Sequence, residues 1–116
     1  MRVLVCGDRH WTDRQRIGVR LATLDPDKDV VIHGGCRGAD KLAGMAAKAH
    51  GIPVECYPAE WERYGRGAGP IRNQQMLDRG VDLLLAFHPH IVTSKGTRDM
   101  VLRAREAGVT VELINE

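Results

Sequence analysis

The chain has 116 residues, of which 43% are hydrophobic and 28% charged, and its formal net charge at pH 7 is +2. This length supports one hydrophobic core but not two, so we expect a single domain over residues 1–116. The small net charge and the absence of any run of Lys or Arg argue against nucleic acid as the main partner.

Apolar runs alternate with amphipathic segments from the first residues onward. We expect strands at about 2–6, 29–33, 53–57, 82–87 and 109–114, alternating with helices at about 12–24, 39–50, 70–79 and 97–107. The first helix has a candidate capping box in Thr12 and Gln15, and Gly51, Gly80 and Gly108 mark joints from a helix to the next strand. The alternation predicts a three-layer, Rossmann-like α/β domain with a mainly parallel five-stranded sheet.

The stretch after the second predicted strand has the composition of an anion-binding turn. An apolar run at 30–33 is followed by Gly34, Gly35 and Gly38. Glycines let a ligand approach the backbone, and the N–H groups of the next helix point into the same space, so phosphate or carboxylate is the expected guest. The alternative is that these glycines only turn the chain. A second turn of similar chemistry, at 93–97, favours ligand binding.

Polar, glycine-bearing turns follow three of the predicted strands, at 7–10, 33–40 and 88–99, whereas the opposite ends of the strands are plain. In open α/β sheets, ligands bind beyond the carboxyl ends of the strands. We therefore expect the site where these three turns meet. The dinucleotide fingerprint Gly-x-Gly-x-x-Gly does not follow the first strand, so ordinary NAD-dependent hydride transfer is not expected.

The candidate ligand-binding residues come from these turns and from a further loop that enters a helix at Arg72. They are glycines for phosphate contact, cations for charge neutralisation and polar side chains for hydrogen bonds: Gly7, Arg9, His33, Gly34, Gly35, Arg37, Gly38, Asp40, Arg72, Asn73, Ser94, Lys95, Gly96 and Thr97. Two carboxylates, Asp40 and Asp99, are candidate catalytic residues.

Each of the main candidates also has a structural interpretation. Arg72 could be a solvated residue of its helix's first turn, and Asp40 could simply complement the positive end of its helix. Ser94 and Thr97 are also ordinary N-cap residues. Trp61 could stack on a base, but we expect it to pack the loop onto the body of the protein or onto a second subunit.

The remaining signals exclude other classes of protein. No apolar segment approaches the ~20 residues that a membrane span needs, and the first residues enter a strand rather than a signal peptide, so we expect a cytoplasmic protein without membrane contact. Cys6, Cys36 and Cys56 are too widely spaced for a zinc site and are expected to be reduced. His88 and His90 lack a further ligand at a suitable spacing, so no metal is expected.

Several ordered motifs are spread along nearly the whole chain: Gly7-Asp8-Arg9 with Asp13, then His33 to Asp40, Pro58 to Trp61, Gly65 to Asn73 and Ser94 to Asp99. Together they resemble the small YspA/YpsA-related branch of the SLOG superfamily. That superfamily is Rossmann-like and includes the LOG nucleotide phosphoribohydrolases and the DNA-processing protein DprA. The resemblance implies a nucleotide or nucleotide-derived ligand, no required cofactor, and a homodimer as an option.

The sequence departs from the LOG enzymes at their catalytic turn. When the LOG Pro-Gly-Gly-x-Gly-Thr-x-x-Glu turn is aligned on Gly96, Met100 stands at the catalytic Glu position and Asp99 is its neighbour. The LOG Arg-Lys-x-x-Met segment has a partial counterpart in Arg72 and Met76, which implies that Arg72 reaches a ligand phosphate.

Three functions are consistent with these patterns. The leading hypothesis is a domain that binds, and possibly senses, a nucleotide-derived ligand through its glycine-rich turns. The second is a nucleotide-processing hydrolase that cleaves an N-glycosidic or phosphate bond, with Asp40 or Asp99 as the carboxylate. The third and weakest is a DprA-like binder of single-stranded DNA, which the small net charge disfavours.

Overall fold

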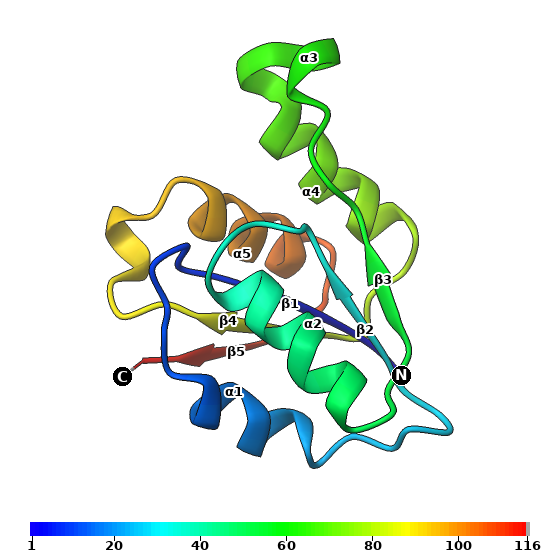
Figure 1. Ribbon diagram of the computed structural model, residues 1–116. Coiled ribbons are helices and arrows are strands. Elements are labelled where there is room, and N and C mark those ends of the chain that lie inside the picture. Colours follow the sequence, from blue (N-terminus) through cyan, green and yellow to red (C-terminus); the bar gives the residue numbers. More distant parts are fainter. Residues whose placement is uncertain (116) are drawn as a thin grey trace.

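The computed structural model describes residues 1–115, so Glu116, the last residue of the predicted domain, lies outside the described residues. Five strands form one sheet in the order β3-β2-β1-β4-β5 (Figure 1). They are β1 (Arg2–Gly7), β2 (Val30–His33), β3 (Val54–Cys56), β4 (Leu83–Phe87) and β5 (Thr110–Ile114). Every neighbouring pair is parallel, which confirms the predicted Rossmann-like α/β fold.

Helices cover both faces of the sheet (Figure 1). On one face lie α1 (Arg14–Leu21) and α2 (Ala39–Ala49), and on the other lie α4 (Ala68–Asp78) and α5 (Gly96–Glu106). Three short helices were not expected from the sequence: α3 (Trp61–Tyr64) and the 3-10 helices η1 (Gly65–Gly67) and η2 (Ile91–Thr93). Within residues 1–115, no helix combines the length and the apolar character needed to cross a membrane.

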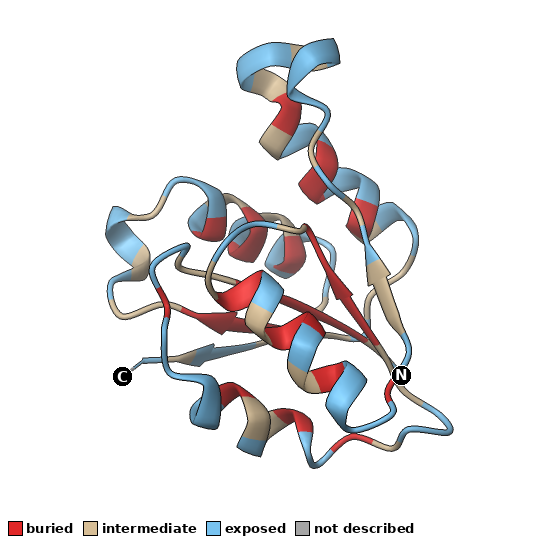
Figure 2. Ribbon diagram, in the orientation of Figure 1, coloured by how far each residue is buried: buried red, intermediate tan, exposed pale blue. Residues whose placement is uncertain are grey.

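The core consists of two apolar layers that share the central strands. Alternate residues of β1 face opposite layers, since Val3 and Val5 pack with α1 and α2, whereas Leu4 and Cys6 pack with α4 and α5. Figure 2 shows that burial is concentrated in β1, β2 and β4, while β5 is mostly exposed. Burial on both faces explains why the central strands are continuous apolar runs rather than alternating ones.

The first helix begins and ends at different residues from those predicted. The predicted capping box of Thr12 and Gln15 is wrong, because Asp13 is the N-cap and its Oδ1 accepts a hydrogen bond from the Arg16 N–H at 3.0 Å. The buried Trp11 indole donates to the Asp13 carbonyl at 3.0 Å and so fixes the cap one residue later. The helix ends at Leu21 rather than at residue 24.

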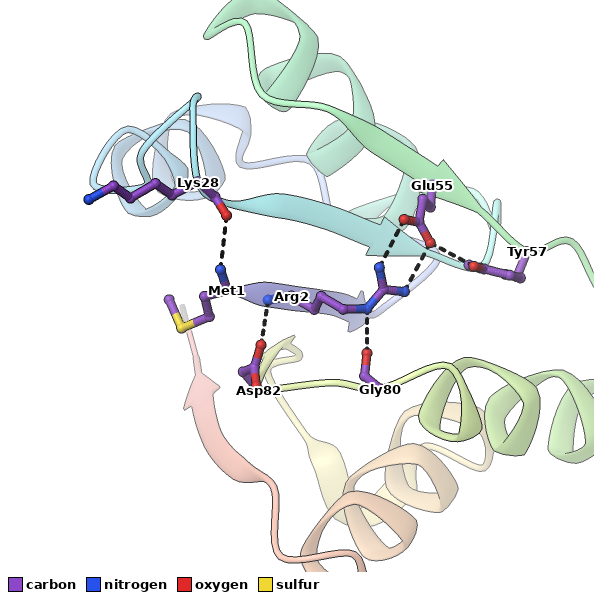
Figure 3. Close-up of polar contacts among 7 residues, drawn as sticks. All are labelled: Met1, Arg2, Lys28, Glu55, Tyr57, Gly80 and Asp82. Carbon is purple, nitrogen blue, oxygen red and sulfur yellow. Dashed lines mark hydrogen bonds and ion pairs between the residues drawn. The ribbon is translucent and has the colours of Figure 1, made fainter.

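Arg2 joins three segments at the amino ends of the strands (Figure 3). Its backbone N–H donates to Asp82 Oδ2 at 2.7 Å, and its Nε donates to the Gly80 carbonyl at 2.7 Å. Its Nη1 and Nη2 donate to both oxygens of Glu55, each at 2.9 Å, and the Tyr57 hydroxyl donates to the same carboxylate at 2.6 Å. These donors lower the pKa of Glu55 to about 2. The network therefore ties β1, β3 and the start of β4 together at the end of the sheet opposite the polar turns.

The packing around Gly7 gives a test of the fold. A Cβ at Gly7 would collide with the Phe87 carbonyl and lie 2.7 Å from the Ala39 Cβ, whereas a Cβ at Gly18 would meet nothing within 4 Å. We expect Gly7→Ala to lower the free energy of unfolding by about 2 kcal/mol or more, and Gly18→Ala to raise it by roughly 0.5–1 kcal/mol. Urea unfolding followed by circular dichroism measures both. Equal effects of the two changes would contradict the packing described.

Candidate functional site

A pocket of about 400 Å³ lies at the carboxyl ends of the strands, where the turns after β1, β2 and β4 meet. We call it the main pocket. It is lined by part of the predicted set, namely Gly7, Arg9, Asp40, Arg72, Asn73, Ser94, Lys95, Gly96 and Thr97. The other predicted residues, His33, Gly34, Gly35, Arg37 and Gly38, do not line it.

Backbone hydrogen bonds of Asp8 hold the turn after β1 to the end of β4 and to the start of α2. The Asp8 N–H donates to the Phe87 carbonyl at 2.9 Å, and the Asp8 carbonyl accepts from the N–H groups of Trp11 and Ala39, each at 3.1 Å. The buried Trp11 ring packs edge-on against Phe87, with 5.6 Å between ring centroids. The backbone around Arg9 is therefore fixed, while the Arg9 side chain is exposed at the pocket.

The first three amides of the turn after β2, those of Gly34, Gly35 and Cys36, donate to the side chains of His33 and Asp40. Asp40 Oδ2 accepts from the Gly34 N–H at 2.9 Å and from the Cys36 N–H at 3.4 Å, and His33 Nδ1 accepts from the Gly35 N–H at 3.0 Å. The carboxylate of Asp40 thus takes the amides of Gly34 and Cys36. The N–H groups of Arg37, Gly38 and Asp40, at the start of α2, donate to no acceptor within the described residues. Gly34 and Gly35 serve to let the chain turn and pack closely.

Arg72 supports the same turn from α4. Its Nη1 donates to the Gly34 carbonyl at 2.7 Å, and its Nε donates to Asn73 Oδ1 at 3.1 Å. A Cβ at Gly34 would lie 2.6 Å from the Arg72 Cζ, so the glycine is what allows this close approach. Arg72 is buried, and the interpretation of it as a solvated residue is therefore wrong.

The two candidate catalytic carboxylates lie in different environments. Asp40 is buried and borders the main pocket, and its Oδ1 accepts no hydrogen bond from residues 1–115. Burial raises the pKa of Asp40 to about 6, and the Gly34 N–H and the Arg72 charge only partly offset it. Asp99 does not line the pocket, because its Oδ2 is bonded to Asn73 Nδ2 and Arg103 Nε, each at 2.9 Å.

Unused amides are also found in the turn that enters α5. Ser94 Oγ accepts from the Thr97 N–H at 3.1 Å, which satisfies one amide of the helix start. The N–H groups of Lys95, Gly96 and Arg98 donate to no acceptor within the described part of the chain. This end of α5 therefore has open donors beside the main pocket, together with the positive end of the helix dipole.

Several residues that line the main pocket were not among the sequence candidates: Cys6, Asp8, His10, Cys36, Met76, His88, Thr93 and Met100. Two of these residues could have been placed at the pocket from sequence periodicity alone. Strand alternation places Cys6 on the face covered by α4 and α5, and Met76 lies one helical turn after Arg72.

Trp61 is 58% exposed and is not a core residue. Among residues 1–115, no three His, Cys, Asp or Glu side chains are grouped so that they could hold a metal ion.

The chain is similar in sequence and in fold to known proteins. The family model described as "YspA, cpYpsA-related SLOG family" matches residues 1–64. Gene 61 protein of Mycobacterium phage D29 is 39% identical over 118 residues, which cover 95% of this chain and 93% of that protein. The X-ray structure of DNA processing protein A (DprA) from Streptococcus pneumoniae superposes with a TM-score of 0.76 at 20% identity over 99% of this chain. The chain spans 50% of that DprA chain, and the likeness shows a shared fold.

The raised pKa of Asp40 predicts an unusual pH dependence. The folded state binds a proton on Asp40 up to about pH 6, whereas the unfolded chain loses it near 3.8. Protonation of Asp40 therefore contributes up to about 3 kcal/mol to the free energy of unfolding. This contribution is fully present below pH 3.8 and is lost as the pH rises through 6.

We expect the free energy of unfolding of Asp40→Asn to lack this pH-dependent contribution. The difference in unfolding free energy between variant and wild type should therefore change between pH 4 and 6 and be constant above pH 7. Urea unfolding at a series of pH values measures it. Because Glu55 titrates near 2 in both proteins, its contribution cancels. A difference that does not vary with pH would contradict the assignment.

Proposed function

The chain belongs to the YspA/cpYpsA-related SLOG family, and from this premise we propose that the main pocket binds a nucleotide or nucleotide-derived ligand with a phosphate at the start of α5. The observation that carries the proposal is the set of unused amides of Lys95, Gly96 and Arg98, two of which belong to residues that line the pocket. Open N–H groups at a helix start, combined with the helix dipole, are a general phosphate site.

Cationic side chains support an anionic ligand. Arg9 and Lys95 line the main pocket, are exposed, and form no ion pair within the described residues. Arg72 adds positive charge at the pocket wall, although its hydrogen bonds hold the turn after β2. Charge-assisted hydrogen bonds from Arg9 and Lys95 would therefore complement the phosphate.

The rest of the pocket suits the remainder of a nucleotide. Met76 and Met100 are buried and give the pocket an apolar wall on which a base can pack. Asp40 Oδ1 is an acceptor without a partner among residues 1–115, so it can receive a hydrogen bond from a ribose hydroxyl or an exocyclic amine. The pocket thus offers separate chemistry for phosphate, sugar and base.

A second candidate function is hydrolysis of the bound nucleotide. The observation that favours it is the position of Asp40, a carboxyl group at the pocket with a pKa of about 6 that can exchange a proton near neutral pH. Asp40 is favoured over Asp99, which is held by Asn73 and Arg103.

Binding is tested by thermal shift and calorimetry with AMP, ADP, ATP, GTP, NAD and ADP-ribose. A ligand at 100 times its Kd should stabilise the protein by ~2.7 kcal/mol, which raises the Tm by roughly 10 °C in a domain of this size. We expect Lys95→Glu to weaken binding about tenfold or more, because it places a negative charge beside the phosphate. The matched Lys28→Glu, at the opposite end of the sheet beside Met1, should bind like wild type.

The outcomes separate the hypotheses. If no compound shifts the Tm, or if Lys95→Glu binds as well as wild type, phosphate binding at the start of α5 is excluded. Chromatography of the same mixtures then distinguishes binding from hydrolysis: an intact ligand supports a binding domain, and a product that disappears with Asp40→Asn supports an enzyme.

A further inference from the structure

We propose that a second pocket, beside the main one, is a subsite for a second phosphate group, so that the ligand is a small molecule with two phosphates separated by a nucleoside. A 5′-phosphorylated dinucleotide is the simplest member of this class. The inference rests on the proposed function of the main pocket and specifies its ligand further.

The second pocket adjoins the main pocket. It has a volume of about 470 Å³ and lies between the turn after β1 and the first turns of α1 and α2, with Thr12 and Leu42 among its lining residues. Arg9 and His10 line both pockets, so one ligand can contact both by passing along this short stretch of the turn.

Three cations from three different elements surround the second pocket: Arg9 from the turn, Arg14 from α1 and Lys41 from α2. All three are exposed, and within the described residues none of their side chains forms an ion pair or hydrogen bond. No carboxylate lines this pocket. The two carboxylates of the nearby turn are already bonded to amides, Asp8 to the His10 N–H and Asp13 to the Arg16 N–H, each at 3.0 Å.

The positions of two of these cations are unfavourable for the helices that carry them. Arg14 is the first residue of α1, directly after the N-cap Asp13, and Lys41 lies in the first turn of α2, directly after the buried Asp40. Positive charge at a helix start opposes the helix dipole, and three like charges around one pocket repel one another. A bound anion relieves both effects, and residues that break a local rule in this way are expected at functional sites.

The backbone that carries Arg9 is fixed before any ligand binds. Ala39 and Trp11 both donate to the Asp8 carbonyl at 3.1 Å, and a Cβ at Gly38 would collide with the backbone of Asp8 and Arg9. The turn after β1 is therefore packed directly onto the start of α2. The backbone of this subsite therefore loses little entropy when a ligand binds.

The test compares AMP with the dinucleotide pApA by calorimetry. The variant is Arg14→Gln with Lys41→Gln, and the matched control is Arg16→Gln with Lys48→Gln, which makes the same change of charge on the same two helices outside the second pocket. We expect pApA to bind wild type and control at least about tenfold more tightly than AMP. The variant should bind AMP normally and lose that tenfold gain.

Each other outcome overturns the inference in a distinguishable way. If AMP binds but pApA binds no more tightly, or if the control loses as much as the variant, the second subsite is wrong while the proposed function stands. If neither compound binds, the proposed function fails and the inference fails with it. A (dA)12 strand could instead bind tenfold more tightly than pApA, with a dependence of affinity on salt concentration that corresponds to more than two neutralised phosphates. That result would assign the two pockets to single-stranded nucleic acid.

Discussion

The buried carboxylate of Asp40 determines which part of this site remains open. It accepts the N–H groups of Gly34 and Cys36, and Arg72 holds the Gly34 carbonyl from the opposite side. The first half of the turn after β2 is thereby bonded internally, although its glycines resemble an anion-binding turn. This arrangement buries a carboxyl group, and burial raises its pKa to about 6.

Open amide donors also lie on the other side of the pocket, at the start of α5. The amides at the start of α5 have no acceptor among residues 1–115, and Arg9 and Lys95 provide mobile positive charge at the pocket. Beyond Arg9, the second pocket continues the positive potential to Arg14 and Lys41. The carboxyl ends of the strands thus have two adjoining pockets lined by exposed cations, whereas the Arg2 network lies at the amino ends.

The fold was predictable because it depends on local periodicity. Apolar runs and glycines before strands gave the five parallel strands and the four long helices, with ends displaced by a few residues. The cap of α1 was missed by one residue, because the choice of Asp13 depends on the buried Trp11. The pocket where the three turns meet was predictable, but the hydrogen bonds of its amides were not. Whether an amide is used or open depends on tertiary hydrogen bonds, such as that between Arg72 and Gly34, which no local pattern contains.

The most direct measurement is a titration of ¹⁵N-labelled protein with AMP, followed by amide chemical shifts. If phosphate binds at the start of α5, the largest changes occur at the amides of Lys95, Gly96 and Arg98, while those of Gly34 and Cys36 hardly move because Asp40 already holds them. The opposite pattern, with the largest changes at Gly34 and Cys36, or a spectrum that AMP leaves unchanged, would contradict the assignment of the phosphate site.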